Sequence, residues 1–176
     1  MSGRLFGLVL AAVLTTGAVA QDGPFGGFKH DSSEDIEITA DSLEVREAES
    51  IAIFSGTVEA GQGTLRLNAD KVIVEYDTEQ QDSETGAIRN MKAEGNVFLT
   101  NGAETATGRF AEYDVASGQM MMRGEVILTQ GGNAVSGELL QIDMNTGRAQ
   151  MLGGVIADGS SGRVRSIFKP SSGNSN

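Results

Sequence analysis

Three recurring aspartates are the residues of this chain whose type and spacing come nearest to acid–base chemistry. Asp77 and Asp114 each follow a tyrosine, Asp143 follows an isoleucine, and a Ser-Gly or Thr-Gly pair comes after each of them. Paired carboxylates are the machinery of glycosidases, in which two acids take different roles. A catalytic pair is normally unique, whereas these aspartates return with the same neighbours. We therefore expect each of them to accept backbone N–H bonds in the turn after a strand.

The residue types for other catalytic or metal-binding chemistry are scarce. His30 is the only histidine and cysteine is absent, so nucleophilic triads lack their base and zinc lacks its usual ligands. The segment Gly61-Gln62-Gly63 lacks the third glycine of a dinucleotide-binding loop. The formal net charge of −11 disfavours nucleic acid, because phosphate contacts need clustered lysine and arginine. The sequence thus predicts no enzyme, no cofactor and no metal site.

The elements that carry these aspartates repeat along the chain. A short phrase, Gly-x-Val, returns at residues 56–58, 95–97, 124–126 and 153–155. The last three copies are 29 residues apart, and the first interval is 39 residues. A period in this range indicates units that stack, because no unit can bury its apolar face alone. The longer first interval predicts a polar loop that leaves the stack at residues 78–87.

Apolar residues between these phrases alternate with polar ones, as at residues 65–69 and 72–76. This period of two is typical of half-buried strands. Turn-forming pairs such as residues 117–118 separate the strands. Strands of about five residues, spaced at roughly 8–12 residues, predict an all-β protein. We expect Asp41 and Asp70, which both follow an alanine, to form turns between consecutive strands.

The start of the chain has the features of an export signal. An apolar run follows Arg4, and residues 18–20 form an A-x-A cleavage site. These features predict a secretory signal peptide over residues 1–20 that is cleaved before Gln21. The apolar run is too short to span about 30 Å of hydrocarbon, which disfavours a membrane anchor. We therefore expect an exported protein whose stability depends on its core, since it has no cysteine for disulfides.

The remaining chain divides into three parts. Residues 21–35 are rich in glycine, serine and aspartate, which predicts a flexible lead-in. The β-domain is expected to span residues 36–169 and to end with a strand at 163–168. Residues 170–176 are polar and predict a disordered tail.

Several motifs of this domain resemble those of a known family. They are IEITAD at 36–41, AIFSGTV at 52–58, QGTLRLNADKVIV at 62–74 and RVRSIFKP at 163–170. Together with the later Gly-Asn-Val and Tyr-Asp phrases, they resemble the LptA/OstA family of lipopolysaccharide-transport proteins. The resemblance implies a β-jellyroll, in which two antiparallel sheets form a slightly open, V-shaped sandwich with an apolar interior.

The resemblance also implies a function. In this family a periplasmic, non-enzymatic carrier joins head to tail with itself, with an inner-membrane-anchored LptC and with an outer-membrane LptD. Lipopolysaccharide moves along the continuous groove with its acyl chains inside. An acidic chain does not attract anionic head groups, so we expect the affinity to come from burial of the acyl chains, at about 0.8 kcal/mol per methylene. The phosphates would then face solvent.

The alternating apolar positions are the candidates for the lining of this groove. Methionines such as Met120 and Met122 suit an apolar surface that adapts to its ligand. Alternation fixes which residues share a face, but not which face is the groove. The candidates are Ile36, Ile38, Phe54, Leu65, Leu67, Val72, Val74, Val97, Leu99, Tyr113, Met120, Met122, Leu128 and Ile142.

Head-to-tail assembly predicts a second set of residues at the two ends of the domain. Unpaired strand edges can add strands from another chain. Acidic residues surround the first strand and basic residues surround the last, and opposite charges favour the joining of unlike ends. The candidates are Glu37, Ile38, Arg163, Arg165 and Phe168.

Two other interpretations remain open from the residues alone. A secreted β-repeat protein that binds polysaccharide would need exposed aromatics and a unique carboxylate cluster, but aromatic residues are only 5% of the chain. A structural β-repeat protein would need no ligand at all. Within the family, a cleavable signal disfavours the LptC role, and the lack of a following barrel segment disfavours the LptD role.

Overall fold

The structure is a computed structural model of the chain. It describes residues 25, 27–29, 31, 33–77, 87–154 and 162–170. The predicted signal peptide, residues 78–86 of the predicted polar loop and the chain after Pro170 lie outside these residues. Those features therefore stay predictions, and Ala87, the last residue of the predicted loop, already belongs to a strand.

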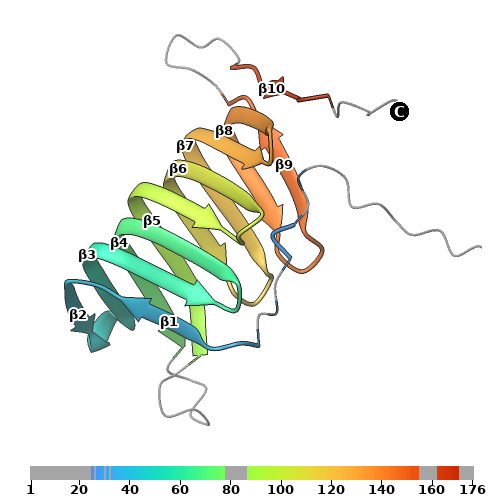
Figure 1. Ribbon diagram of the computed structural model, residues 1–176. Helices are drawn as coiled ribbons and strands as arrows, with labels where there is room; N and C mark the ends of the chain where they lie inside the picture. Colours follow the sequence, from blue (N-terminus) through green and yellow to red (C-terminus); the bar gives the residue numbers. More distant parts are fainter. Residues whose placement is uncertain are drawn as a thin grey trace, which may run out of the picture.

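Antiparallel strands make up almost the whole of the described chain (Figure 1). The all-β class is therefore confirmed, and so is the last strand predicted near residues 163–168. The elements are β1 (Ile36–Thr39), β2 (Ser42–Arg46), the short 3-10 helix η1 (Glu47–Glu49), β3 (Ile51–Gln62), β4 (Leu65–Asp77), β5 (Ala87–Thr100), β6 (Glu104–Asp114), β7 (Gln119–Gln130), β8 (Asn133–Asp143), β9 (Arg148–Leu152) and β10 (Arg165–Ile167).

One hydrogen-bonded sheet supplies both layers of the jellyroll. At its start, β1 pairs with the second half of β3 and β2 with the first half. At its end, β10 pairs with the first half of β8 and β9 with the second half. The long strands between them therefore pass through both layers, and the two predicted sheets are two layers of one sheet. We call them the β1 layer (β1, β10 and residues 58–68, 97–107 and 126–136) and the β2 layer (β2, β9 and residues 51–55, 71–77, 87–94, 110–114, 119–123 and 139–143).

The repeated Gly-x-Val phrase is the point at which alternate strands bend from one layer into the other. The pairing register shifts between Ser55 and Val58 in β3, and the same shift recurs at the second and third copies in β5 and β7. In each case two residues of the bulged strand lie opposite one residue of its partner, which kinks the strand. Gly56, Gly95 and Gly124 have φ of 101°, 77° and 86°, which side chains other than glycine rarely adopt.

The predicted strand length is wrong, because the strands continue through these bulges. The sequence predicts strands of about five residues that stop at each glycine, but β3 to β8 are 11 to 14 residues long and include the glycines. Pairing continues because a bulge absorbs the extra residue without ending the ladder. The valines of the first three phrases point into the core just past the bend, and Val58, Val97 and Val126 are at most 1% exposed.

Two aspartates accept hydrogen bonds from residues in the first two bulges. The Asp41 carboxylate, between β1 and β2, accepts a hydrogen bond from the backbone N–H of Thr57 (3.1 Å). Asp70 accepts one from the side-chain amide of Asn96 (2.8 Å). The prediction that Asp70 forms a turn is wrong, because β4 runs straight past the bulge and Asp70 lies within that strand. A Cβ at Gly95 would lie only 2.2 Å from the Asp70 carboxylate, so the glycine also makes room for its partner.

The predicted turn role of Asp114 and Asp143 is confirmed. Asp114 accepts hydrogen bonds from the backbone N–H (2.8 Å) and hydroxyl (2.7 Å) of Ser117. Asp143 accepts them from the backbone N–H groups of Asn145 (3.0 Å) and Thr146 (3.1 Å). These bonds favour the ionised form, so they hold the pKa of both carboxyl groups below the usual range. The recurring aspartates at 114 and 143 are therefore occupied in turns rather than available for catalysis.

The core lies between the two layers and includes one residue from before the first strand. Phe28 is 1% exposed and belongs to the same core cluster as Leu99 and Met122. The lead-in was predicted to be flexible from its composition, so the burial of Phe28 corrects that prediction at this residue. A single large aromatic side chain can anchor a polar segment, because its burial removes a large apolar area from water.

Candidate functional site

A small apolar hollow of about 50 Å³ lies between the layers. Among the described residues no charged side chain borders it. The side-chain amide of Gln62 is the polar group at its rim, and it donates a hydrogen bond to the carbonyl of Glu34 (2.8 Å). The lining comes from β1 and β3 to β7 and consists of Ile36, Ala60, Gly61, Gln62, Leu65, Leu67, Val72, Met91, Ala93, Leu99, Ala111, Tyr113 and Met120.

Two alanines on neighbouring strands make room for this hollow. The register places Val72 opposite Ala93, Ala93 opposite Ala111, Ala111 opposite Met122 and Met122 opposite Leu140. All five side chains are buried between the layers. An alanine side chain ends at Cβ, so this row leaves space at β5 and β6 that it fills at β7 and β8.

The interior beyond the hollow is closely filled. Met122, Leu140, Ile142 and Met144 are at most 1% exposed and belong to one core cluster. The backbone N–H of Met144 donates a hydrogen bond to the carbonyl of Gly118 (2.8 Å), which joins two turns at this end. The interior therefore changes from hollow to filled along the sheet.

The inner apolar face continues to the β2 edge of the sheet, where it is uncovered. Leu43 lies opposite Phe54, and Val45 lies opposite Ala52, so both share the inward face of β3. They are nevertheless 57% and 54% exposed, because no further strand covers the edge. Exposed apolar side chains in one row indicate an interaction surface rather than a solvated face.

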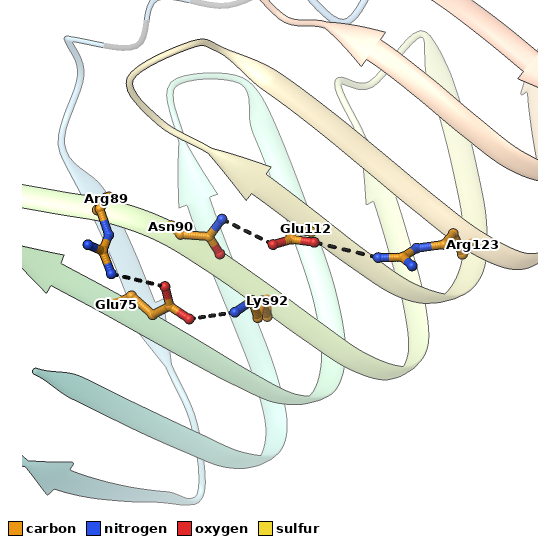
Figure 2. A network of polar contacts seen from close by, with 6 residues as sticks. All are labelled: Glu75, Arg89, Asn90, Lys92, Glu112 and Arg123. Atoms are coloured by element: carbon orange, nitrogen blue, oxygen red, sulfur yellow. Dashed lines mark hydrogen bonds and ion pairs between the residues drawn. The ribbon is translucent and has the colours of Figure 1, made fainter. Parts of the chain in front are cut away.

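The outer face of the β2 layer carries the charges (Figure 2). Lys92 contacts Glu75 at 2.5 Å and Arg89 contacts the same carboxylate at 3.4 Å, while Arg123 lies 3.5 Å from Glu112. The hydrogen bond from Lys92 holds the pKa of the Glu75 carboxyl below its usual range. Successive residues of a strand point to opposite faces of the sheet. The ion pairs therefore mark the outer face of the β2 layer, and the apolar lining marks its inner face.

Tyr113 brings a hydroxyl group into the apolar lining. Burial raises the pKa of its phenol, and the neighbouring Asp114 charge acts in the same direction. The ordinary pKa of tyrosine is already about 10, so the phenol stays neutral at physiological pH. Tyr113 therefore adds no charge to the lining of the hollow.

Charged clusters do not provide a competing site in the part of the chain that the structure describes. There, no group of three or more His, Cys, Asp or Glu side chains is placed to hold a metal ion. No helix among the described residues is long and apolar enough to cross a bilayer. The apolar hollow is thus the feature that a function has to explain.

Comparison with known proteins establishes the family. Residues 37–148 match the family model described as "LptA/(LptD N-terminal domain) LPS transport protein". The chain belongs to this family. The LptA family is a lipopolysaccharide-transport family and is in general not enzymatic.

One solved structure and one protein sequence are similar to this LptA-family chain. The crystal structure of LptH from Pseudomonas aeruginosa, titled the LptA homologous periplasmic component of the conserved lipopolysaccharide transport device, matches with a TM-score of 0.66 and 19% sequence identity. The match covers 80% of this chain and 99% of that chain, and it shows the shared jellyroll fold. An uncharacterized protein of Rhizobium meliloti (strain 1021) is 33% identical over 102 residues, which is 56% of this chain and 55% of that protein. The chain thus matches about half the length of this curated relative.

The predicted lining residues of the LptA-family chain all face the same interior, but only half of them border the hollow. Those that do are Ile36, Leu65, Leu67, Val72, Leu99, Tyr113 and Met120. Val74, Val97, Met122, Leu128 and Ile142 lie in the filled core around it, and Ile38 and Phe54 pack partly buried against that core. Contact of any of these residues with a lipid stays a prediction.

Sequence reasoning missed the small residues that create the space. Ala60, Ala93 and Ala111, together with the larger Met91, border the hollow but are not among the predicted lining residues. Each shares the inward parity of a predicted residue, as Ala111 does with Tyr113 two positions later. The signal was therefore present in the alternation, but alanine contributes little to an apolar pattern.

The residues predicted for head-to-tail contact lie at opposite ends of the sheet of this LptA-family chain. Glu37 and Ile38 are in β1 and Arg165 is in β10, which are the first and last strands in the order of the sheet. Arg163 and Phe168 flank β10 and are exposed. The geometry brings each set together at its own edge, and contact between the two sets of different molecules stays a prediction.

Proposed function

We propose that this protein is a periplasmic carrier that binds lipopolysaccharide through its acyl chains and passes it along the apolar interior from the inner to the outer membrane. The observation that carries the proposal is the apolar hollow inside an LptA-family jellyroll, whose lining has no charged side chain among the described residues. Each methylene removed from water contributes about 0.8 kcal/mol, so a dozen of them supply on the order of 10 kcal/mol. The predicted signal peptide over residues 1–20 would bring the chain to the periplasm.

In this proposal, several molecules join edge to edge into a longer carrier. The β1 and β2 edge of one molecule would receive the β9 and β10 edge of the next, either of this chain or of an LptC-like or LptD-like jellyroll. Supporting this, both edges expose apolar side chains, which are Leu43 and Val45 at one and Ile167 and Phe168 at the other. Main-chain hydrogen bonds between edge strands would give affinity, and the apolar faces would become one continuous surface.

Lipid binding can be tested with two substitutions on one strand that add the same charge. Leu67→Asp places a carboxylate on the wall of the hollow, and Asn68→Asp places one on the opposite face of β4. We expect lipopolysaccharide photo-crosslinking and co-purification, read by native mass spectrometry, to be lost in Leu67→Asp and retained in Asn68→Asp. Circular dichroism verifies that both variants are folded. Equal lipid binding by the two folded variants would sink the groove assignment.

Assembly can be tested through the charges of the two edges. Glu37→Arg and Arg165→Glu each make the edges repel, because like charges then face each other across the joint. We expect each single variant to reduce the mass seen by light scattering, and the double variant to restore it. Assembly that is unaffected by either single variant and by added salt would contradict the charge contribution while leaving the lipid-binding role intact.

A further inference from the structure

The segment before β1 holds onto the hairpin turns of the β1 layer. We call it the strap and define it as the described residues from Phe25 to Asp35. Figure 1 shows it running past successive turns before it enters β1. The backbone N–H of Phe25 donates to the Gln130 side chain (3.0 Å), and that of Gly27 donates to the Glu104 carboxylate (3.0 Å).

The strap inserts one aromatic side chain into the space between the layers. Phe28 is 1% exposed and shares its core cluster with hollow-lining residues such as Leu99 and Met120. On either side the strap is held by polar groups: the Asn101 amide donates to the carbonyl of Gly27 (2.5 Å) and Gln62 donates to that of Glu34 (2.8 Å). Phe28 therefore occupies apolar interior that no strand of the sheet fills.

The attachment of the strap differs from that of every strand around it. Its described residues belong to no strand. Hydrogen bonds join its backbone to the side chains of Gln62, Asn101, Glu104 and Gln130, and the ring of Phe25 contacts that of Phe168. Such bonds can exchange with water when the segment lifts, whereas a strand would have to give up a ladder. Phe28 would leave a fully buried apolar site behind, which a hydrocarbon chain can fill, whereas Phe25 is only partly buried against the core.

We propose that the strap is a displaceable gate, in which Phe28 holds the place of a hydrocarbon chain in the empty carrier and leaves when an acyl chain enters. This inference rests on the proposed lipid-carrying function. A ligand shifts a conformational equilibrium only through a difference in its affinity for the two states. That difference exists here, because an acyl chain and Phe28 compete for the same apolar space between the layers.

The chain has neither cysteine nor tryptophan, which makes the gate directly testable in the full protein. A Cβ at Gly27 would lie 3.1 Å from the Asn101 side-chain nitrogen, so the side chains at these two positions meet. Gly27→Cys with Asn101→Cys is therefore the pair with which to lock the strap by a disulfide. As a matched control, a Cβ at Gly132 would lie 3.2 Å from the Cβ of Lys169. Gly132→Cys with Lys169→Cys thus locks the C-terminal segment, whose Phe168 contacts Phe25, but leaves Gly27 and Phe28 of the strap without a covalent tie.

The probe is dansylated undecanoic acid, whose fluorescence reports binding to apolar sites. We expect the oxidised strap-locked protein to bind it about tenfold more weakly than its reduced form, or weaker still. The control pair should bind equally in both redox states. Equal binding by locked and reduced protein, with the disulfide verified by mass spectrometry, overturns the gate but leaves the carrier role. If wild type and both reduced variants all fail to bind the probe, the carrier role and the gate fall together.

A second measurement reports the position of the strap itself. Phe28→Trp puts the only tryptophan of the chain at the gate. Its emission should be that of a buried indole without probe, and should move to longer wavelength and become accessible to iodide as undecanoic acid saturates the protein. Saturable binding of the fatty acid with an indole that stays buried contradicts displacement of the strap.

Discussion

The space between the layers is hollow beside β4, β5 and β6, yet it is filled beside β7 and β8. The backbone is the same in both halves: long antiparallel strands, each bulged strand bent at one Gly-x-Val phrase. The difference is in side-chain volume, since Ala93 and Ala111 occupy the row that Met122 and Leu140 continue. One fold thus combines a site for a ligand with a core that holds the sheet together.

Truncation in the filled half should have the largest effect. Leu140 is fully buried there, so Leu140→Ala leaves a new cavity and should lower the free energy of unfolding by about 2–5 kcal/mol. Leu67 already borders the hollow and is partly exposed, so Leu67→Ala should cost only about 1–2 kcal/mol. Urea unfolding followed by circular dichroism measures both. Equal losses would mean that the two halves do not differ in packing.

The bends should be equally important in both halves. Gly95→Ala forces a Cβ to within 2.2 Å of Asp70, and Gly124→Ala forces one to within 2.9 Å of the Arg109 Cβ, both at positive φ. We expect each to lower the free energy of unfolding by about 1–3 kcal/mol. The measurement is the same urea titration. If Gly95→Ala is tolerated and Gly124→Ala is not, the bend matters only where the interior is filled.

Filling the hollow should separate binding from stability. Ala111→Leu adds volume where space exists, so the free energy of unfolding should change by less than about 1 kcal/mol, below the usual cost of overpacking. Affinity for dansylated undecanoic acid should nevertheless fall about tenfold. Thr107→Leu, an exposed position of the same strand, is the control and should leave the affinity unchanged. Unchanged binding in Ala111→Leu would place the ligand elsewhere.

Acid should weaken the turns beside the filled half, with the smallest effect of the four. The pKa of Asp114 and of Asp143 is lowered in the folded state by backbone and hydroxyl donors, so their stabilisation is complete above the ordinary pKa of about 3.9. It is lost as the pH falls below that value towards the folded-state pKa. In Asp143→Asn, the free energy of unfolding should therefore fall less than in the wild type as the pH is lowered below about 4. Glu59→Gln, an exposed residue of β3, is the control, and an identical acid response in both variants would contradict the role of the turn.

The sequence was informative about periodicity and less so about what the glycines do. Alternation predicted the strands and which residues share a face, and the structure turns the face of Leu65, Val72 and Met120 inward. From the sequence, each Gly-x-Val phrase marks the boundary at which one strand ends and the next begins, because glycine commonly interrupts strands. Only the pairing of the flanking residues with the next strand shows that the ladder continues through it.

The local chemistry of the strands and turns can be read directly along the chain. Period-two alternation specifies strands and their parity, the turn aspartates close hairpins between near neighbours, and the absence of cysteine leaves stability to the core. Each of these depends on residues a few positions apart, so each can be read along the chain.

Tertiary structure decided where the interior is empty and what occupies it. The hollow exists because the register sets Ala93 beside Ala111 and between larger neighbours, and a one-residue slip would turn both to the outer face. Phe28 reaches the core because its strap binds side chains as far away as Gln130, 105 residues beyond Phe25. Volume and long-range contact are properties of the packed sheet, so no single stretch of sequence contains them.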